Sequence, residues 1–143
     1  MDIMERKVKH LEFIQSGISR MNQCSFQMKG WAITVVSALI ALFAASVDKD
    51  TGKGNSIYFF VAIFPTFIFW VLDSYYLQQE RKFRAVYNDI THDLEQTIID
   101  EFSIPLLNYK GKKYNLLCVM FSKTEWLLYI SIIIGLLIAG FCV

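Results

Sequence analysis

The chain has 143 residues, a formal net charge of +1 and a hydrophobic content of 55%. Its mean hydropathy is +0.39, and 15% of its residues are aromatic. A soluble domain of this length would expose too much apolar surface, so we expect lipid to cover part of the chain. The composition therefore excludes an ordinary soluble domain and favours a small integral membrane protein.

The first 30 residues carry an amphipathic pattern. Apolar side chains recur every three or four residues at Met4, Val8, Leu11, Ile14, Ile18 and Met21. This spacing places them on one stripe of a helix whose other face is polar. We predict an amphipathic helix over residues 1–30, which either continues into the next segment or bends at Gly30.

The first of three apolar runs covers residues 31–47 and contains no Lys, Arg, Asp, Glu or His. With its flanks it reaches the roughly 17–25 residues that cross a bilayer. Small and polar residues line one side of it, namely Thr34, Ser37, Ala38, Ala41 and Ala45. A small-residue face lets helices approach closely. It predicts contact with the other spans of the same chain, or else a subunit contact or pore lining.

The second apolar run covers residues 57–72, so residues 31–76 form a predicted transmembrane hairpin. Pro65 lies at the centre of this run and predicts a kink, because proline leaves the carbonyl of Val61 without its helical donor. A neighbouring helix or Thr66 would compensate for the missing hydrogen bond.

Asp73 follows the second run directly and needs an explanation. Three environments fit an acidic residue at this depth. It reaches water at the interface, it forms a buried pair with Arg81, Arg84 or a lysine, or it narrows the mouth of a pore.

Residues 77–125 carry a second amphipathic pattern, at Phe83, Val86, Tyr87, Ile90, Leu94 and Ile98. It predicts that the second helix continues beyond the span and packs on the N-terminal stripe to form a helical body. Exposed stripes would instead recruit a second chain or a regulator. The pattern ends at Ile104-Pro105.

Six cations in this segment form the candidate surface for an anion such as a lipid headgroup, a nucleotide or an oligonucleotide. They are Arg81, Lys82, Arg84, Lys110, Lys112 and Lys113. Basic residues near a span are also expected from topology alone, and they favour an anionic leaflet without a specific ligand.

Residues 126–143 form the third apolar run and the third predicted transmembrane helix. The preceding Ser122-Lys123-Thr124-Glu125 has the form of a capping box, in which serine and glutamate satisfy each other's backbone amides. Gly135 and Ala139 give this helix a small face of its own.

The distribution of cations predicts the topology. Five Lys and Arg residues lie in residues 1–30 and seven in residues 77–125, against two between the first two spans. The positive-inside rule therefore places the N-terminus and residues 77–125 in the cytoplasm and the C-terminus in the periplasm.

No motif indicates catalysis or a metal site. The three cysteines are far apart, and His10 and His92 have no ligand-spaced partners. A phosphate-binding glycine loop, a catalytic carboxylate pair and a Cys/His nucleophile are all absent from the sequence. We expect no enzyme, metal or cofactor. Three spans without an internal repeat also disfavour a transporter.

Residues 69–84 read FWVLDSYYLQQERKFR, with MKGW at 28–31 and FSKT at 121–124. This pattern resembles a family of small bacterial inner-membrane proteins found beside signalling enzymes in anti-phage defence operons. The resemblance covers most of the chain. It implies a membrane effector that oligomerises and permeabilises the inner membrane when a nucleotide or oligonucleotide signal changes. The Hailong type, in which a neighbouring nucleotidyltransferase makes DNA oligomers that restrain the effector, fits best.

The sequence thus predicts an all-α membrane protein with three transmembrane helices and a cytoplasmic helical body. We expect a homo-oligomer in membrane lipid, with a tetramer favoured, that acts as a gated ion channel or pore in antiviral defence. A single copy cannot enclose a channel, so a pore requires several copies around an axis. The alternative is a non-conducting membrane anchor or sensor that recruits a cytoplasmic partner.

Overall fold

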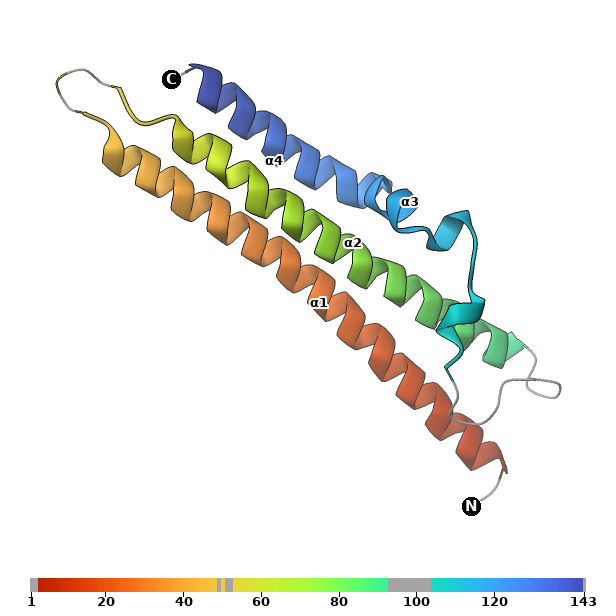
Figure 1. Cartoon of the computed structure of the whole chain (residues 1–143). Helices are drawn as coiled ribbons and strands as arrows, with labels where there is room; N and C mark the ends of the chain where they lie inside the picture. The colour runs from red at the N-terminus through yellow and green to blue at the C-terminus, as the bar shows by residue number, and fades with distance from the viewer. Residues whose placement is uncertain (1–2, 49, 51–52, 93–103, 143) are drawn as a thin grey trace. The chain divides into compact units, whose positions relative to one another are not determined.

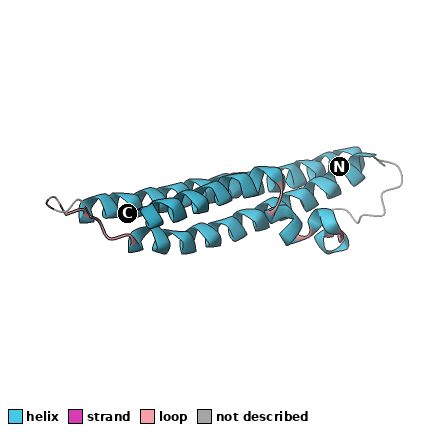
Figure 2. Cartoon of the chain, turned by 90° about the horizontal axis from the view of Figure 1, so that it is seen from above, coloured by secondary structure: helices cyan, strands magenta, loops and turns pink. Residues whose placement is uncertain are grey.

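The computed structural model describes residues 3–48, 50, 53–92 and 104–142. Three long helices dominate it: α1 (Ile3–Ser46), α2 (Ile57–His92) and α4 (Lys123–Cys142), as Figure 1 shows. The short elements η1 (Leu106–Asn108), η2 (Lys112–Tyr114) and α3 (Leu116–Met120) lie between α2 and α4 in the sequence. Figure 2 shows helices and loops and no strand in the described part of the chain.

All three long helices are long and apolar enough to cross a membrane. The prediction of an all-α protein with three candidate spans is therefore confirmed. The N-terminal amphipathic segment and the first apolar run form one helix of 44 residues, α1, which continues through Gly30. The second run likewise continues beyond its apolar part to His92. The predicted positions Leu94 and Ile98 lie outside the described residues.

Pro65 lies inside α2, and the helix continues on both sides of it. The hydroxyl of Thr66, which is fully buried, donates a hydrogen bond to the carbonyl of Ala62 at 2.7 Å. The Thr66 hydroxyl therefore binds the carbonyl of Ala62. It does not bind the carbonyl of Val61, which proline leaves without its helical donor. The kink at Pro65 remains a prediction.

The chain divides into two compact units. The first, here called the helical body, comprises residues 1–25 and 74–119. The second, here called the span unit, comprises residues 26–73 and 120–143. Both α1 and α2 contribute to each unit, while α4 belongs to the span unit.

The core of the helical body joins the two amphipathic stripes. Ile14 and Ile18 of α1 are buried with Val86 and Ile90 of α2. Other apolar side chains pack against them, namely Leu11, Phe83, Tyr87, Ile104, Leu106 and Tyr109. The periodic positions in the two halves of the sequence therefore meet in one core, as helix amphipathicity predicts.

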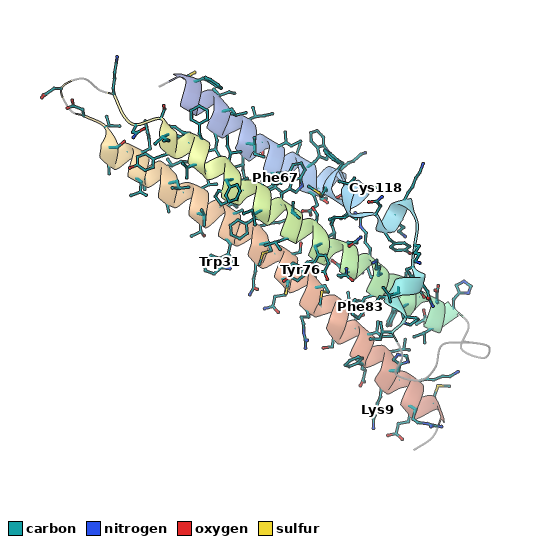
Figure 3. All side chains as sticks on the ribbon, in the orientation of Figure 1. Lys9, Trp31, Phe67, Tyr76, Phe83 and Cys118 are labelled. Atoms are coloured by element: carbon teal, nitrogen blue, oxygen red, sulfur yellow. The ribbon has the colours of Figure 1, made fainter. Side chains whose placement is uncertain are left out.

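Glycine allows a close approach inside the helical body. A Cβ atom at Gly17 would lie 2.9 Å from the ring of Phe83, closer than real side-chain carbons come. Phe83 is labelled on α2 in Figure 3. The ring fills the space that a larger residue on α1 would need.

The core of the span unit is apolar and draws on all three long helices. Val36 of α1, Phe59 and Ala62 of α2, and Leu136 of α4 are buried together. Phe43 packs on Phe59 with ring centroids 4.5 Å apart. The outer surface is apolar as well: Trp31, labelled in Figure 3, is 57% exposed. Apolar residues inside and outside are what lipid surroundings require.

Candidate functional site

Each long helix carries one ionisable residue beside its apolar run. Lys29 precedes the first run, Asp73 follows the second, and Glu125 precedes the third. Because consecutive spans cross a bilayer in opposite directions, these three positions fall at the same boundary of the apolar region. The structure brings all three together within the span unit.

The ammonium of Lys29 lies between the two carboxyl groups. Its Nζ is 2.6 Å from Oδ2 of Asp73 and 3.0 Å from Oε1 of Glu125. The hydroxyl of Tyr129 donates a hydrogen bond to the same Oδ2 of Asp73 at 2.9 Å. These four residues are called the Lys29 cluster below.

The Lys29 cluster is almost completely buried. Asp73 and Tyr129 have no exposed surface, and Glu125 is 2% exposed. The Lys29 side chain retains 25% exposure, so it forms the side of the cluster nearest to solvent. Buried charges of this kind persist only when they are paired.

Trp70 closes the cluster from the apolar side. Its ring stacks on Tyr129, with centroids 6.1 Å apart and planes at 17°. Its indole Nε1 donates a hydrogen bond to the carbonyl of Met120 at 3.2 Å. A buried tryptophan needs such a partner, and this one ties α2 to the residue that ends α3.

The structure selects among the alternatives for Asp73. It is buried and paired with a lysine, Lys29, and does not reach water at the interface. Arg84 pairs instead with Glu80, at 2.7 Å from Nε to Oε1. Lys29, Glu125 and Tyr129 were not among the predicted site residues. The signal that points to Lys29 and Glu125 is an ionisable residue beside each apolar run, at the end of the run that meets the same boundary.

The predicted capping box at the start of α4 does not form. The helix begins at Lys123, as the motif predicts, and the amide of Glu125 donates to the carbonyl of Ser122 at 3.0 Å. However, the Oγ of Ser122 is buried and has no hydrogen-bond partner in the described part of the chain, and the carboxyl of Glu125 binds Lys29 instead. The buried ion pair of Glu125 with Lys29 is stronger than the hydrogen bond that the same carboxyl group would accept from a backbone amide in a capping box.

The small-residue face of the first span lies on the surface of the chain. Thr34, Ser37, Ala38, Ala41 and Ala45 are all exposed. The hydroxyl of Thr34 bonds to the carbonyl of Gly30 in its own helix at 2.9 Å. The predicted contact of this face with the other spans of the same chain is therefore wrong. Larger side chains, among them Val36, make that contact.

The six cations predicted to bind an anion lie in one stretch of the helical body. Gln78 donates from Nε2 to the carbonyl of Tyr114 at 2.6 Å, and Tyr109 donates from its hydroxyl to Asp89 at 2.5 Å. These contacts tie residues 109–114 to the part of α2 between Gln78 and Asp89. The two groups of cations are thereby placed in the same unit: Arg81, Lys82 and Arg84 on α2, and the exposed Lys110, Lys112 and Lys113 on the turn.

The turn itself depends on glycine and on the Tyr109 hydrogen bond. Gly111 has φ of 148°, a conformation that residues with a side chain rarely adopt. Burial raises the pKa of Tyr109 above its ordinary value, and the hydrogen bond to Asp89 raises it further. Tyr109 therefore stays a neutral donor, and it holds the basic turn on α2.

Within the described ranges, no group of three or more His, Cys, Asp and Glu side chains is placed to hold a metal ion. Cys24, Cys118 and Cys142 are free thiols. No protein-family model, curated protein or solved structure matches the chain. By length and composition, its three candidate spans are those expected of a multi-span membrane protein.

Proposed function

We propose that this chain is one subunit of a homo-oligomeric membrane effector, a gated ion channel or pore. It would depolarise or permeabilise the bacterial inner membrane in anti-phage defence under the control of a nucleotide or oligonucleotide. A tetramer is the favoured assembly, with the N-terminus in the cytoplasm and the C-terminus in the periplasm.

The exposed small-residue face of α1 carries the proposal. Ser37, Ala41 and Ala45 repeat every fourth position, and the chain's own helices leave them uncovered. In lipid, such faces associate through close van der Waals packing, since apolar surface alone gives little drive. A second copy of the same face provides a matching surface, and Thr34 and Ser37 supply its hydroxyl groups.

The filled interior of the span unit supports a pore between copies. Val36, Phe59, Ala62 and Leu136 pack against one another at its centre, so a water path through this core would require their separation. A path along the small-residue faces of several copies needs no such rearrangement. Asp73 is buried in the Lys29 cluster, which makes the α1 face the better candidate for the lining.

The regulatory part of the proposal rests on the basic stretch of the helical body. Three exposed lysines, at positions 110, 112 and 113, lie on a turn tied to the helix that bears Arg81 and Lys82. Neighbouring positive charges attract the successive phosphates of a DNA oligomer, and this attraction weakens as the salt concentration rises. In the family that the sequence resembles, a neighbouring nucleotidyltransferase would supply that oligomer.

Membrane potential is the measurement that tests the proposal. We expect bacteria that express the chain alone to lose the signal of a voltage-sensitive dye, and co-expression of the neighbouring operon gene to restore it. Ser37→Leu places bulk on the proposed contact face and should abolish depolarisation and assembly. Ser131→Leu makes the same change at an exposed serine of α4 and should leave both intact. A chain that stays monomeric in mild detergent and in lipid discs would exclude the pore.

One observation favours the second candidate, a non-conducting anchor or sensor. An open groove of about 390 Å³ in the helical body is lined by Val8, Leu11, Glu12, Gln15 and Tyr87. A helix from a cytoplasmic partner would place an apolar face in such a groove. The anchor predicts that Val8→Asp releases the partner while the membrane potential stays constant. Phe13→Asp, at an exposed position of α1 outside the groove, should retain the partner.

A further inference from the structure

The charges of the Lys29 cluster do not balance. Lys29 contributes one positive charge, and Asp73 and Glu125 contribute two negative charges when both are ionised. Both carboxyl groups are at least 98% buried, because Asp73 is 0% and Glu125 2% exposed. A net negative charge in such a site is unfavourable, because the charge has lost its water without gaining a counter-ion. One further positive charge at this site removes that net charge.

The geometry shows where that positive charge would bind. Oε1 of Glu125 accepts from Lys29, but the other oxygen, Oε2, is buried and has no hydrogen-bond partner among the described residues. Asp73 already accepts at Oδ2 from both Lys29 and Tyr129. The two carboxyl groups approach the same nitrogen of Lys29, Oδ2 of Asp73 at 2.6 Å and Oε1 of Glu125 at 3.0 Å, so they lie close to each other. A hydrogen bond between two carboxyl groups forms only with a proton between them.

From this arrangement we infer that the Lys29 cluster is a proton-binding site, in which the carboxyl groups of Asp73 and Glu125 share one proton beside the Lys29 ammonium. The shared proton lets one carboxyl group donate a hydrogen bond to the other, and it brings the net charge of the cluster to zero. Its ionisable neighbours from the three packed helices are Lys29 on α1, Asp73 on α2, and Glu125 and Tyr129 on α4. The proposal does not depend on whether the chain conducts ions.

The 25% exposure of Lys29 gives the site its route to water. Trp70 and Tyr129 cover the opposite, apolar side, so proton exchange proceeds past the lysine. Loss of the shared proton leaves a net negative charge and repulsion between the carboxyl groups of α2 and α4. The net charge of the cluster thus changes by one when the pH at this boundary of the membrane changes enough to add or remove the shared proton.

Infrared spectroscopy of the full-length protein in lipid tests this inference. A protonated carboxylic acid has a carbonyl stretch that lies apart from the carboxylate bands. We expect the wild type at neutral pH to show the intensity of one protonated acid per chain, which disappears at alkaline pH. Glu125→Gln and Asp73→Asn should each remove that band at neutral pH, because the remaining carboxylate then balances Lys29. Lys29→Met should increase it towards two acids per chain.

Glu80 serves as the internal control. It is 7% exposed but is paired with one cation, Arg84, so Glu80→Gln should leave the protonated-acid band unchanged. Dicyclohexylcarbodiimide, which modifies protonated carboxyl groups in apolar sites, should label Glu125 or Asp73 and not Glu80. A spectrum without the band at neutral pH, or a band that both neutral variants retain, would overturn the inference. So would a band that sodium chloride removes and choline chloride does not, since sodium would then be the ligand.

Discussion

Lys29 links the three long helices of the span unit through its side-chain nitrogen. Its nitrogen is the common partner of two carboxyl groups from two other helices. Removing one partner of a buried ion pair is more harmful than removing the whole pair, because the charge left behind loses both water and counter-ion.

Replacing Lys29 with methionine should reduce the free energy of unfolding by about 3–5 kcal/mol, since it leaves two buried carboxyl groups without a cation. Thermal unfolding in detergent measures the effect. The matched control is Lys9→Met, which removes an exposed pair with Glu5 and should change stability by less than about 1 kcal/mol. Adding Asp73→Asn and Glu125→Gln to Lys29→Met should restore most of the loss. Equal effects at positions 9 and 29 would contradict the prediction.

Tyr109 should make stability depend on alkaline pH. Its pKa in the folded state is raised, mainly by burial and also by its hydrogen bond to Asp89. A group whose pKa is raised by folding stabilises the fold below its unfolded pKa, about 10 for tyrosine. That contribution is lost as pH rises from about 10 through the higher folded pKa. Unfolding measured across this range should show a flatter slope in Tyr109→Phe than in the wild type. Identical slopes would show that the hydrogen bond to Asp89 has no such role.

At the scale of elements, α1 meets α2 differently along its length. In the helical body it approaches α2 closely at Gly17, where the ring of Phe83 occupies the place of a side chain. In the span unit, its contact residues include Val36 and Phe43, while Ser37, Ala41 and Ala45 are exposed. Gly17 therefore serves close packing within the chain, and the three small residues of the span unit leave an exposed surface.

Gly17→Leu should destabilise the helical body by about 1–3 kcal/mol, because the new side chain overlaps Phe83 in a packed core. Gly30→Leu is the matched control, since a Cβ atom at Gly30 meets nothing within 4 Å. Thermal unfolding of the two variants separates steric overlap from the general effect of replacing a helical glycine. If Gly17→Leu is as stable as Gly30→Leu, the close approach at Phe83 is not a constraint.

Elements were easier to predict from the sequence than their contacts. Runs without charge predict spans because the cost of burying charge in lipid acts on each segment separately. The stripes through Ile14 and Val86 predict a core because periodicity is local. The partner of Glu125 lies 96 residues away, and a local capping motif accounted for that residue equally well. In the sequence, Lys29 is one of several cations in residues 1–30, and no residue near it in the sequence identifies Asp73 as its partner.

For the molecule as a whole, the cations predict the orientation in the membrane. Lysine and arginine residues predict that residues 77–125, which include α3, face the cytoplasm and that the C-terminus faces the periplasm. Two native cysteines mark these two segments: Cys118 in α3 and Cys142 at the end of α4. Both are exposed in the structure, so both thiols are accessible to a reagent on the correct side of the membrane.

We expect a membrane-impermeant maleimide to label Cys142 but not Cys118 in spheroplasts expressing single-cysteine variants. Lysis of the spheroplasts should make Cys118 react to the same extent. Detergent-solubilised protein, in which both thiols should react, controls for intrinsic reactivity. Labelling of Cys118 with protection of Cys142 would establish the reverse orientation, with the N-terminus in the periplasm.

The distribution of the Lys29 cluster over the helices has a consequence for biogenesis. Lys29 and Asp73 belong to consecutive helices, so the ribosome delivers both before α4 is made. A hairpin of α1 and α2 would therefore enter the membrane with these two charges already paired. Glu125 is made last, when the lysine already has a partner. In the proton-sharing arrangement proposed above, the last helix thus brings the carboxyl group whose arrival requires the proton.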